Sequence, residues 1–128
     1  MSDLPAIHQA LLAALDELEA LTARPSFDPT ELSGTRYRLS RLSSERRREV
    51  EALCDRLLPH VTPEHAAQIK ALRSAMIDAR IASTGHISTW TLREIEADWP
   101  GYCRASNAMR AQMRAQIERE KALLYPTA

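Results

Sequence analysis

The chain has 128 residues, which suits one domain (residues 1–128) with a single hydrophobic core. Its 17 basic residues equal its 17 acidic residues, and this balance disfavours binding to nucleic acids or membranes through a basic excess. No apolar run approaches the length that crosses a bilayer, and the start of the chain lacks a secretory signal pattern. Two cysteines are too few for a disulfide framework. We therefore expect a cytoplasmic protein with reduced thiols.

The first half of the chain predicts two helices. Apolar residues recur at a spacing of three and four over residues 3–23, with Asp3 or Ser2 as the expected cap. A second helix begins at Asp28-Pro-Thr-Glu31, which combines a capping residue, a proline in the first turn and a glutamate two residues later. Its stronger apolar pattern covers residues 36–58, and Ser43-Ser44 leaves open whether the helix is continuous or restarts there.

The second half predicts two long helices and a short one. A third helix opens at Thr62-Pro63 and is expected to stop near Gly85, because glycine suits a left-handed cap. The capping box that begins at Thr91 predicts a short helix up to residue 98. The last helix is expected over residues 101–124 and is ended by Pro126.

These elements predict an all-α fold. Four long helices joined by short connections favour antiparallel neighbours, which gives an up-down-up-down four-helix bundle with a short extra helix before the last long one.

Several polar residues fall within the apolar arcs of these helices. At 100° per residue, this inner set comprises Arg46, Arg73, Arg80, Gln116 and Glu120, with His8 beside the first stripe. A buried charge without a partner costs several kcal/mol, roughly, so these residues predict either an internal polar network or a ligand site. The alternative is that long side chains reach solvent from the edge of the stripe, and we expect this for the three arginines.

The histidines have two interpretations. An up-and-down bundle would bring His8, His60 and His65 to the same end as Gln116 and Glu120. Inward histidines and carboxylates on several helices are the ligands with which bundles hold metals. The alternative, which we favour, is that the four histidines of the chain are unrelated.

The end of the chain resembles a hemerythrin-like motif. In that family a helix carries His-x-x-x-Glu followed by an apolar-aromatic-Pro ending, and here Gln116, Glu120 and Leu124-Tyr125-Pro126 occupy these places. The stretch from Ile7 to Leu12 is similar to the family's first helix, whose histidine binds iron, and His8 occupies that position. Because Gln116 replaces an imidazole ligand, the resemblance implies a divergent bundle that has lost the full diiron site.

Two further groups of residues suggest surfaces. Six arginines lie close together on the second helix, at positions 36, 38, 41, 46, 47 and 48. We expect a solvated face with intrahelical ion pairs. The alternative is a strip that faces an acidic partner or RNA. Trp90, Trp99 and Tyr102 cluster around Pro100. They either plug one end of the bundle, which we favour, or anchor a partner or second subunit.

The sequence contains no phosphate-binding loop and no complete catalytic or metal constellation. We therefore expect no enzymatic activity and no cofactor. The first hypothesis is a bundle that acts through protein–protein contacts, as a regulator or scaffold, with a protein partner or as a homodimer. The second is a metal-binding sensor of O₂, NO or redox state, with iron or zinc held by His8 and Glu120 and assisted by His65 or His60.

Overall fold

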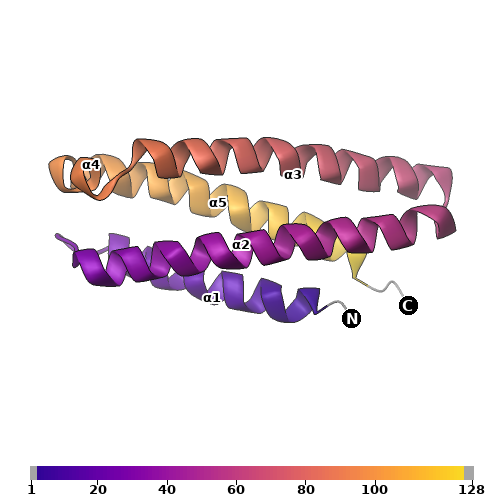
Figure 1. Ribbon diagram of the computed structural model, residues 1–128, viewed down its shortest axis with the longest axis horizontal. Helices are drawn as coiled ribbons and strands as arrows, with labels where there is room; N and C mark the ends of the chain where they lie inside the picture. Colours follow the sequence, from indigo (N-terminus) through magenta and orange to yellow (C-terminus); the bar gives the residue numbers. More distant parts are fainter. Residues whose placement is uncertain (1–2, 126–128) are drawn as a thin grey trace.

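The computed structural model describes residues 3–125, which contain helices and no strand. The elements in chain order are α1 (Leu4–Thr22), α2 (Pro29–Leu57), the 3-10 turn η1 (Leu58–His60), α3 (Pro63–Thr89), α4 (Leu92–Ala97) and α5 (Trp99–Leu124). The four long helices lie side by side, and α4 lies at the end where the chain passes from α3 to α5 (Figure 1). The all-α prediction is confirmed. No helix among the described residues is long and apolar enough to cross a membrane.

The first two helices begin where the sequence predicts. Asp28 Oδ1 accepts hydrogen bonds from the backbone amides of Thr30 and Glu31, at 2.8 and 3.1 Å, and so satisfies donors of the first turn of α2. Asp3 occupies the cap position of α1, but its side chain makes no capping hydrogen bond. Ser2, the other expected cap, lies outside the described residues.

The second helix is continuous through the serine pair. It runs without interruption from Pro29 to Leu57, so the break that Ser43-Ser44 left open does not occur. Leu42 and Arg46, on either side of the pair, are both buried. Tertiary packing therefore holds this turn helical despite the weaker helix propensity of serine.

The prediction that the third helix stops near Gly85 is wrong. The helix α3 continues to Thr89, and Gly85 has no positive φ angle. Glycine inside a helix costs only about 0.5–1 kcal/mol relative to alanine, which the surrounding helical hydrogen bonds tolerate. The helix ends where Thr91 adopts the extended backbone of an N-cap and accepts a hydrogen bond from the Glu94 amide at 3.3 Å.

The last helix begins two residues earlier than predicted, at Trp99. Asp98 Oδ1 accepts a hydrogen bond from the Gly101 amide at 3.0 Å, and Pro100 fits the first turn because that turn needs no amide donor there. Pro100 therefore separates α4 from α5 without kinking a longer helix. Pro126, the expected end of the last helix, lies outside the described residues.

The apolar core consists of two clusters. The larger cluster, nearer α4, includes Leu11, Leu15, Leu18, Leu32, Leu39, Leu42, Ile95, Tyr102 and Ile117. The smaller cluster, nearer η1, comprises Leu4, Val50, Cys54, Ile69, Leu72, Met76 and Leu124. On α1, α2 and α5, about one turn of buried polar residues separates the two clusters. We call this set, His8, Arg46, Gln116 and Glu120, the polar layer.

Candidate functional site

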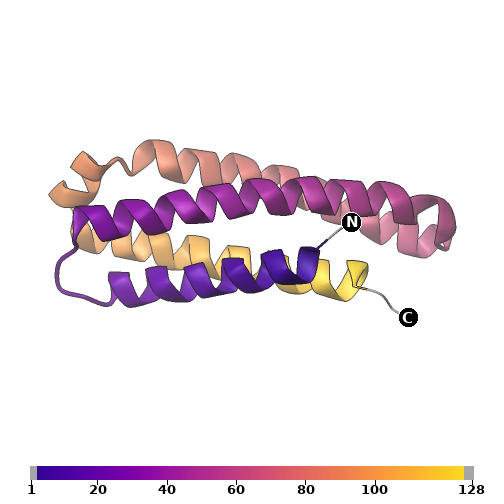
Figure 2. The same ribbon diagram turned by 60° about the horizontal axis from the view of Figure 1, so that its bottom comes forward.

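His8 and Glu120 form the centre of the polar layer. His8 Nε2 lies 2.8 Å from Glu120 Oε1, and both side chains are buried. The other ring nitrogen, Nδ1, lies 2.6 Å from the hydroxyl of Tyr125. This contact joins the first turns of α1 to the end of α5, which lie close together in Figure 2. Both ring nitrogens of His8 are therefore already engaged by the chain itself.

Two further side chains converge on the same carboxylate. Gln116 Nε2 donates a hydrogen bond to Glu120 Oε2 at 3.2 Å. Arg46 Nε lies 3.4 Å from that oxygen as an ion pair, but the contact lacks hydrogen-bond geometry. Arg46 is only 4% exposed, so our expectation that it reaches solvent is wrong. Its partner on α5 makes burial possible, because a buried charge is tolerated when an opposite charge faces it.

The other two inner arginines do reach solvent, as expected. Arg73 on α3 forms ion pairs with Glu51 at 2.7 Å and Asp55 at 3.2 Å, and its side chain is 30% exposed. The hydrogen bond that Arg73 donates to Glu51 is the main reason that the pKa of Arg73 is raised. Arg80 is exposed. The inner polar network therefore contains Arg46 and Gln116, and not Arg73 or Arg80.

The remaining candidate metal ligands do not join His8 and Glu120. His65 Nε2 lies 3.3 Å from the backbone carbonyl of Leu123, and His60 is exposed. Within residues 3–125, no group of three or more His, Cys, Asp or Glu side chains could hold a metal ion. The set of His8, His65 and Glu120 stays a prediction.

The cysteines carry no sign of nucleophilic chemistry. Cys54 is buried in the smaller cluster, and burial raises the pKa of its thiol to about 11. Cys103 is half-buried, and burial raises its pKa as well. Both are free thiols, and a raised pKa leaves little thiolate to react near neutral pH.

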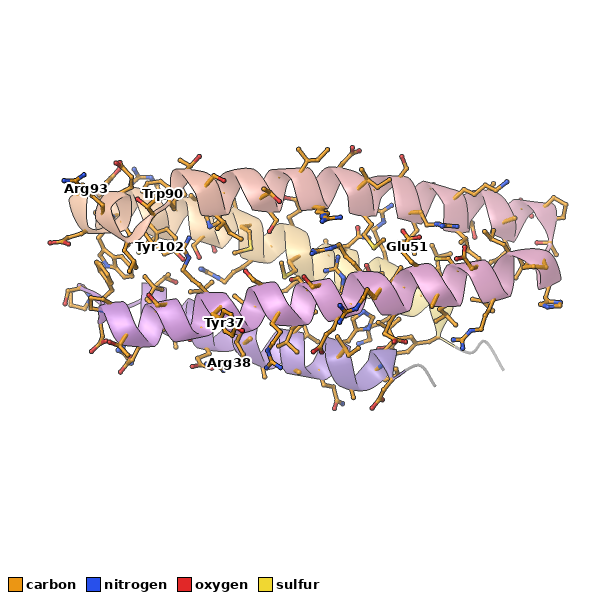
Figure 3. All side chains as sticks on the ribbon, viewed as in Figure 1. Tyr37, Arg38, Glu51, Trp90, Arg93 and Tyr102 are labelled. Carbon is orange, nitrogen blue, oxygen red and sulfur yellow. The ribbon has the colours of Figure 1, made fainter. Side chains whose placement is uncertain are left out.

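The aromatic residues Trp90, Trp99 and Tyr102 pack against one another. Tyr102 is fully buried, and its ring centroid lies 5.7 Å from that of Trp90 and 5.8 Å from that of Trp99. Figure 3 shows Trp90 and Tyr102 at the α4 end of the molecule. Trp99 also stacks on Phe27 and donates a hydrogen bond to the carbonyl of Arg24 at 3.0 Å. Tyr102 has no exposed surface that a partner could contact, whereas Trp90 and Trp99 remain partly exposed.

A cavity of about 310 Å³ lies beside the polar layer, between α2, α3 and α5. The space exists because small side chains line it on all three helices, among them Ser43 on α2, Ala79 on α3 and Ala105 on α5. The last buried residue of α3 is Met76, so the second half of this helix contributes no side chain to the core. We refer to this space as the α2–α3–α5 cavity.

The charged lining of the α2–α3–α5 cavity is entirely basic. Arg46, Arg47 and Arg80 line it together with His86, and none of its lining residues is Asp or Glu. Burial lowers the pKa of Arg47, and the nearby charges of Arg80 and Arg46 lower it further. His86 Nε2 is buried and has no hydrogen-bond partner among the described residues. The pKa of His86 is lowered by burial and then by Arg36.

A shallower hollow, which we call the α2–α3 groove, opens on the surface beside this cavity. It measures about 430 Å³ and is lined by Ser44, Arg47, Arg48, Glu51, Met76, Ile77 and Arg80. Glu51 lies between α2 and α3 (Figure 3). Ile77 is 57% exposed, and Ile81, one turn further along α3, is 67% exposed.

The polar groups that sequence reasoning missed include the buried side chain of Arg110 and the buried Nε2 atom of His86. His86 was overlooked because the third helix was expected to stop before it. Arg110 is 4% exposed and donates a hydrogen bond to Ser106 Oγ at 2.6 Å. The available signal was the spacing of the inner face of α5, which runs four, three, four, three and four residues through Ser106, Arg110, Met113, Ile117, Glu120 and Leu124.

Comparisons with known proteins give no relative from which a role could be transferred. The chain matches no protein-family model, no curated protein sequence and no solved structure. Its function is therefore inferred from the polar layer, the cavity and the groove.

Proposed function

We propose that this protein is a non-catalytic up-down-up-down four-helix bundle that acts through protein–protein contacts, as a regulator or scaffold. The α2–α3 groove would receive an acidic amphipathic helix of a partner protein. The observation that carries this proposal is a groove lined by the exposed Ile77 and by arginines that form no ion pair within residues 3–125, with the exposed Ile81 one turn further along α3.

The apolar part of the argument concerns α3. Ile77 and Ile81 lie four residues apart and therefore on one face of the helix, and both are more than half exposed. Covering a large aliphatic side chain is worth about 1.5–3 kcal/mol when its burial is complete. Adjacent exposed aliphatic residues beside a groove are typical of a surface that another helix covers.

The electrostatic part concerns the walls of the groove. Arg47, Arg48 and Arg80 line it, against the single carboxylate of Glu51. That carboxylate is already paired with Arg73 at 2.7 Å, so the groove has a net positive charge. An acidic helix would complement this charge, whereas a second copy that docked the same groove symmetrically would place arginines against arginines.

Site-specific photo-crosslinking tests the proposal directly. A photoreactive amino acid is placed at Ile81, and the matched control carries it at Ala13, which is exposed on α1. After irradiation in the native cells, the crosslinked peptides are identified by mass spectrometry. We expect position 81 to crosslink to an acidic, helix-forming segment of one protein and position 13 not to do so.

Charge reversal then separates a specific contact from chance capture. Arg48 is exposed, so the Arg48→Glu variant should remain folded. The reversed charge should remove most of the crosslink from position 81. The proposal is wrong if both positions capture the same proteins, if Arg48→Glu leaves the yield unchanged, or if position 81 captures only a second copy of this chain.

The second candidate function is the metal sensor that the hemerythrin-like resemblance implies. It is favoured by one observation: a buried histidine and carboxylate from different helices lie 2.8 Å apart, at His8 and Glu120. A metal ion would have to replace that contact and take its remaining ligands from His65 or solvent. His8→Ala should then abolish stoichiometric binding of iron or zinc, and unchanged binding would reject this function.

A further inference from the structure

The α2–α3–α5 cavity, which is partly open to solvent beside the groove, has the properties of a second binding site. We propose that it binds a small apolar carboxylic acid. The carboxylate would face Arg47 and Arg80, and the hydrocarbon part would lie against Met109 and Met113, which line the same cavity. The cavity shares Arg47 and Arg80 with the α2–α3 groove. The inference nevertheless does not rest on the proposed protein partner, because it concerns a different ligand and has its own test.

The size of the space is the first argument. The α2–α3–α5 cavity measures about 310 Å³, and a neighbouring space of about 180 Å³ shares Ser83, His86 and Met113 with it. Small-molecule sites usually measure about 300–1,000 Å³. The combined space is therefore at the lower end of that range, which suits a compact organic molecule.

Unpaired positive charge is the second argument. Neither Arg47 nor Arg80 forms an ion pair within residues 3–125, and the only side-chain hydrogen bond of Arg47 there is to Ser44 Oγ at 3.0 Å. Arg46 also lines the cavity and is more than nine-tenths buried, but its Nε lies 3.4 Å from Glu120 Oε2, so the charges without an acidic partner are those of Arg47 and Arg80. A carboxylate in this position would accept charge-assisted hydrogen bonds from guanidinium groups that the chain leaves without an acid.

The rest of the lining indicates a monoanion with an apolar body. Met109, Met113 and alanines such as Ala79 and Ala105 supply apolar walls. Glu120 already faces Arg46, so the positive charge left to neutralise is that of Arg47 and Arg80. The pKa of His86 is lowered, so its imidazole is neutral near pH 7 and adds no third charge. A doubly charged phosphate would bind more weakly here, because most of the space is apolar and its charge would lose hydration.

Isothermal titration calorimetry with octanoate tests this assignment on the purified full chain. Octanoate should bind with one site per chain. Two probes separate the contribution of the charge from that of the hydrocarbon chain. The first, 1-octanol, has a similar chain without the charge, and the second, inorganic phosphate, has the charge without the chain. We expect both to bind at least about tenfold more weakly, because each lacks one half of the recognition. Equal binding of either probe, or no binding of octanoate, would overturn the assignment.

Variants locate the bound acid. Arg47→Ala and Arg80→Ala should each weaken octanoate binding about tenfold, the effect of one lost charge-assisted hydrogen bond. Arg41→Ala is the matched control, since Arg41 lies on the same helix outside the cavity and pairs with Glu45 at 3.9 Å. Ala79→Leu should fill the cavity and abolish binding while the circular dichroism of the folded protein is retained. Octanoate binding that survives Arg80→Ala and Ala79→Leu unchanged would show that the cavity is not the site.

Discussion

At the scale of single residues, the organising group is the carboxylate of Glu120. Its two oxygens face His8, Arg46 and Gln116, which belong to three different helices. A buried ion pair of this kind contributes little net stability compared with a well-packed apolar pair. It does constrain alignment, because the partners meet only when α1, α2 and α5 have the observed register.

Removing that carboxylate should be costly. Glu120→Ala leaves Arg46 buried without a counter-charge, and we expect it to lower the free energy of unfolding by about 3–5 kcal/mol in urea denaturation. Glu118→Ala is the matched control on the same helix, because that side chain is 67% exposed, and its effect should stay within about 0.5 kcal/mol. The double variant Glu120→Leu with Arg46→Met should recover much of the lost stability. Equal effects at positions 118 and 120 would contradict the described pairing.

His86 should make stability depend on pH in a defined direction. Its pKa is lowered from 6.5 by burial, so below pH 6.5 the unfolded chain binds a proton more readily than the folded chain. The free energy of unfolding should therefore fall as the pH falls from 7 to 5. In His86→Gln this histidine-dependent part of the decrease should be absent. Parallel stability curves for the two proteins over this range would be evidence against a buried, uncharged His86.

At the level of helices, local signals placed the boundaries within about one residue, except for the end of α3 and the beginning of α5. The Asp28 and Thr91 caps follow directly from side chains that can accept hydrogen bonds from first-turn amides. The end assigned at Gly85 was wrong because glycine permits a left-handed cap without requiring one. The continuity of α2 through Ser43 depends on packing with other helices, which a local pattern does not contain.

Two glycines should respond in opposite directions to alanine. Gly34 lies inside α2, and a Cβ there would meet nothing within 4 Å. Gly34→Ala should therefore raise the free energy of unfolding by about 0.5–1 kcal/mol. A Cβ on Gly101 would overlap the Asp98 carboxylate that caps α5, so Gly101→Ala should lower stability by about 1 kcal/mol. Thermal unfolding of the two variants beside the wild type measures both effects, and the same sign at both positions would refute this explanation.

At the scale of the whole molecule, α3 is the least evenly packed of the long helices. Its buried residues, Ile69, Leu72 and Met76, all lie in its first half and belong to the smaller cluster. The second half instead borders the α2–α3–α5 cavity and carries the exposed Ile77 and Ile81. Both proposed binding regions therefore lie where one helix leaves its neighbours incompletely covered.

Hydrogen exchange should show this difference along a single helix. Amides of α3 beyond residue 77 should exchange through openings of lower free energy than amides between residues 69 and 76, because fewer buried contacts hold them. Exchange monitored by NMR, residue by residue, provides the comparison, with the buried middle of α1 as the protected reference. Uniform protection along α3 would contradict the uneven packing.

The composition of the polar layer could be predicted from helical periodicity, but its connections could not. The period of 3.6 residues placed Arg46, Gln116 and Glu120 on inner faces, with His8 beside its stripe. Whether a polar residue on an inner face is buried depends on the side chain opposite it. Arg46 faces Glu120 and is buried, whereas Arg80 is exposed. The cavity had no signal in the sequence, because alanine and serine fit both a tight helix contact and an empty space.

We propose that the chain itself completes the polar layer and that the protein works by binding other molecules without a metal. The most direct measurement is the metal content of tag-free protein purified without chelators, determined by elemental analysis with an absorption spectrum alongside. We expect a folded protein without stoichiometric metal, because both nitrogens of His8 are engaged by Glu120 and Tyr125. Stoichiometric iron or zinc that disappears in His8→Ala would contradict it and would make the sensor the leading function.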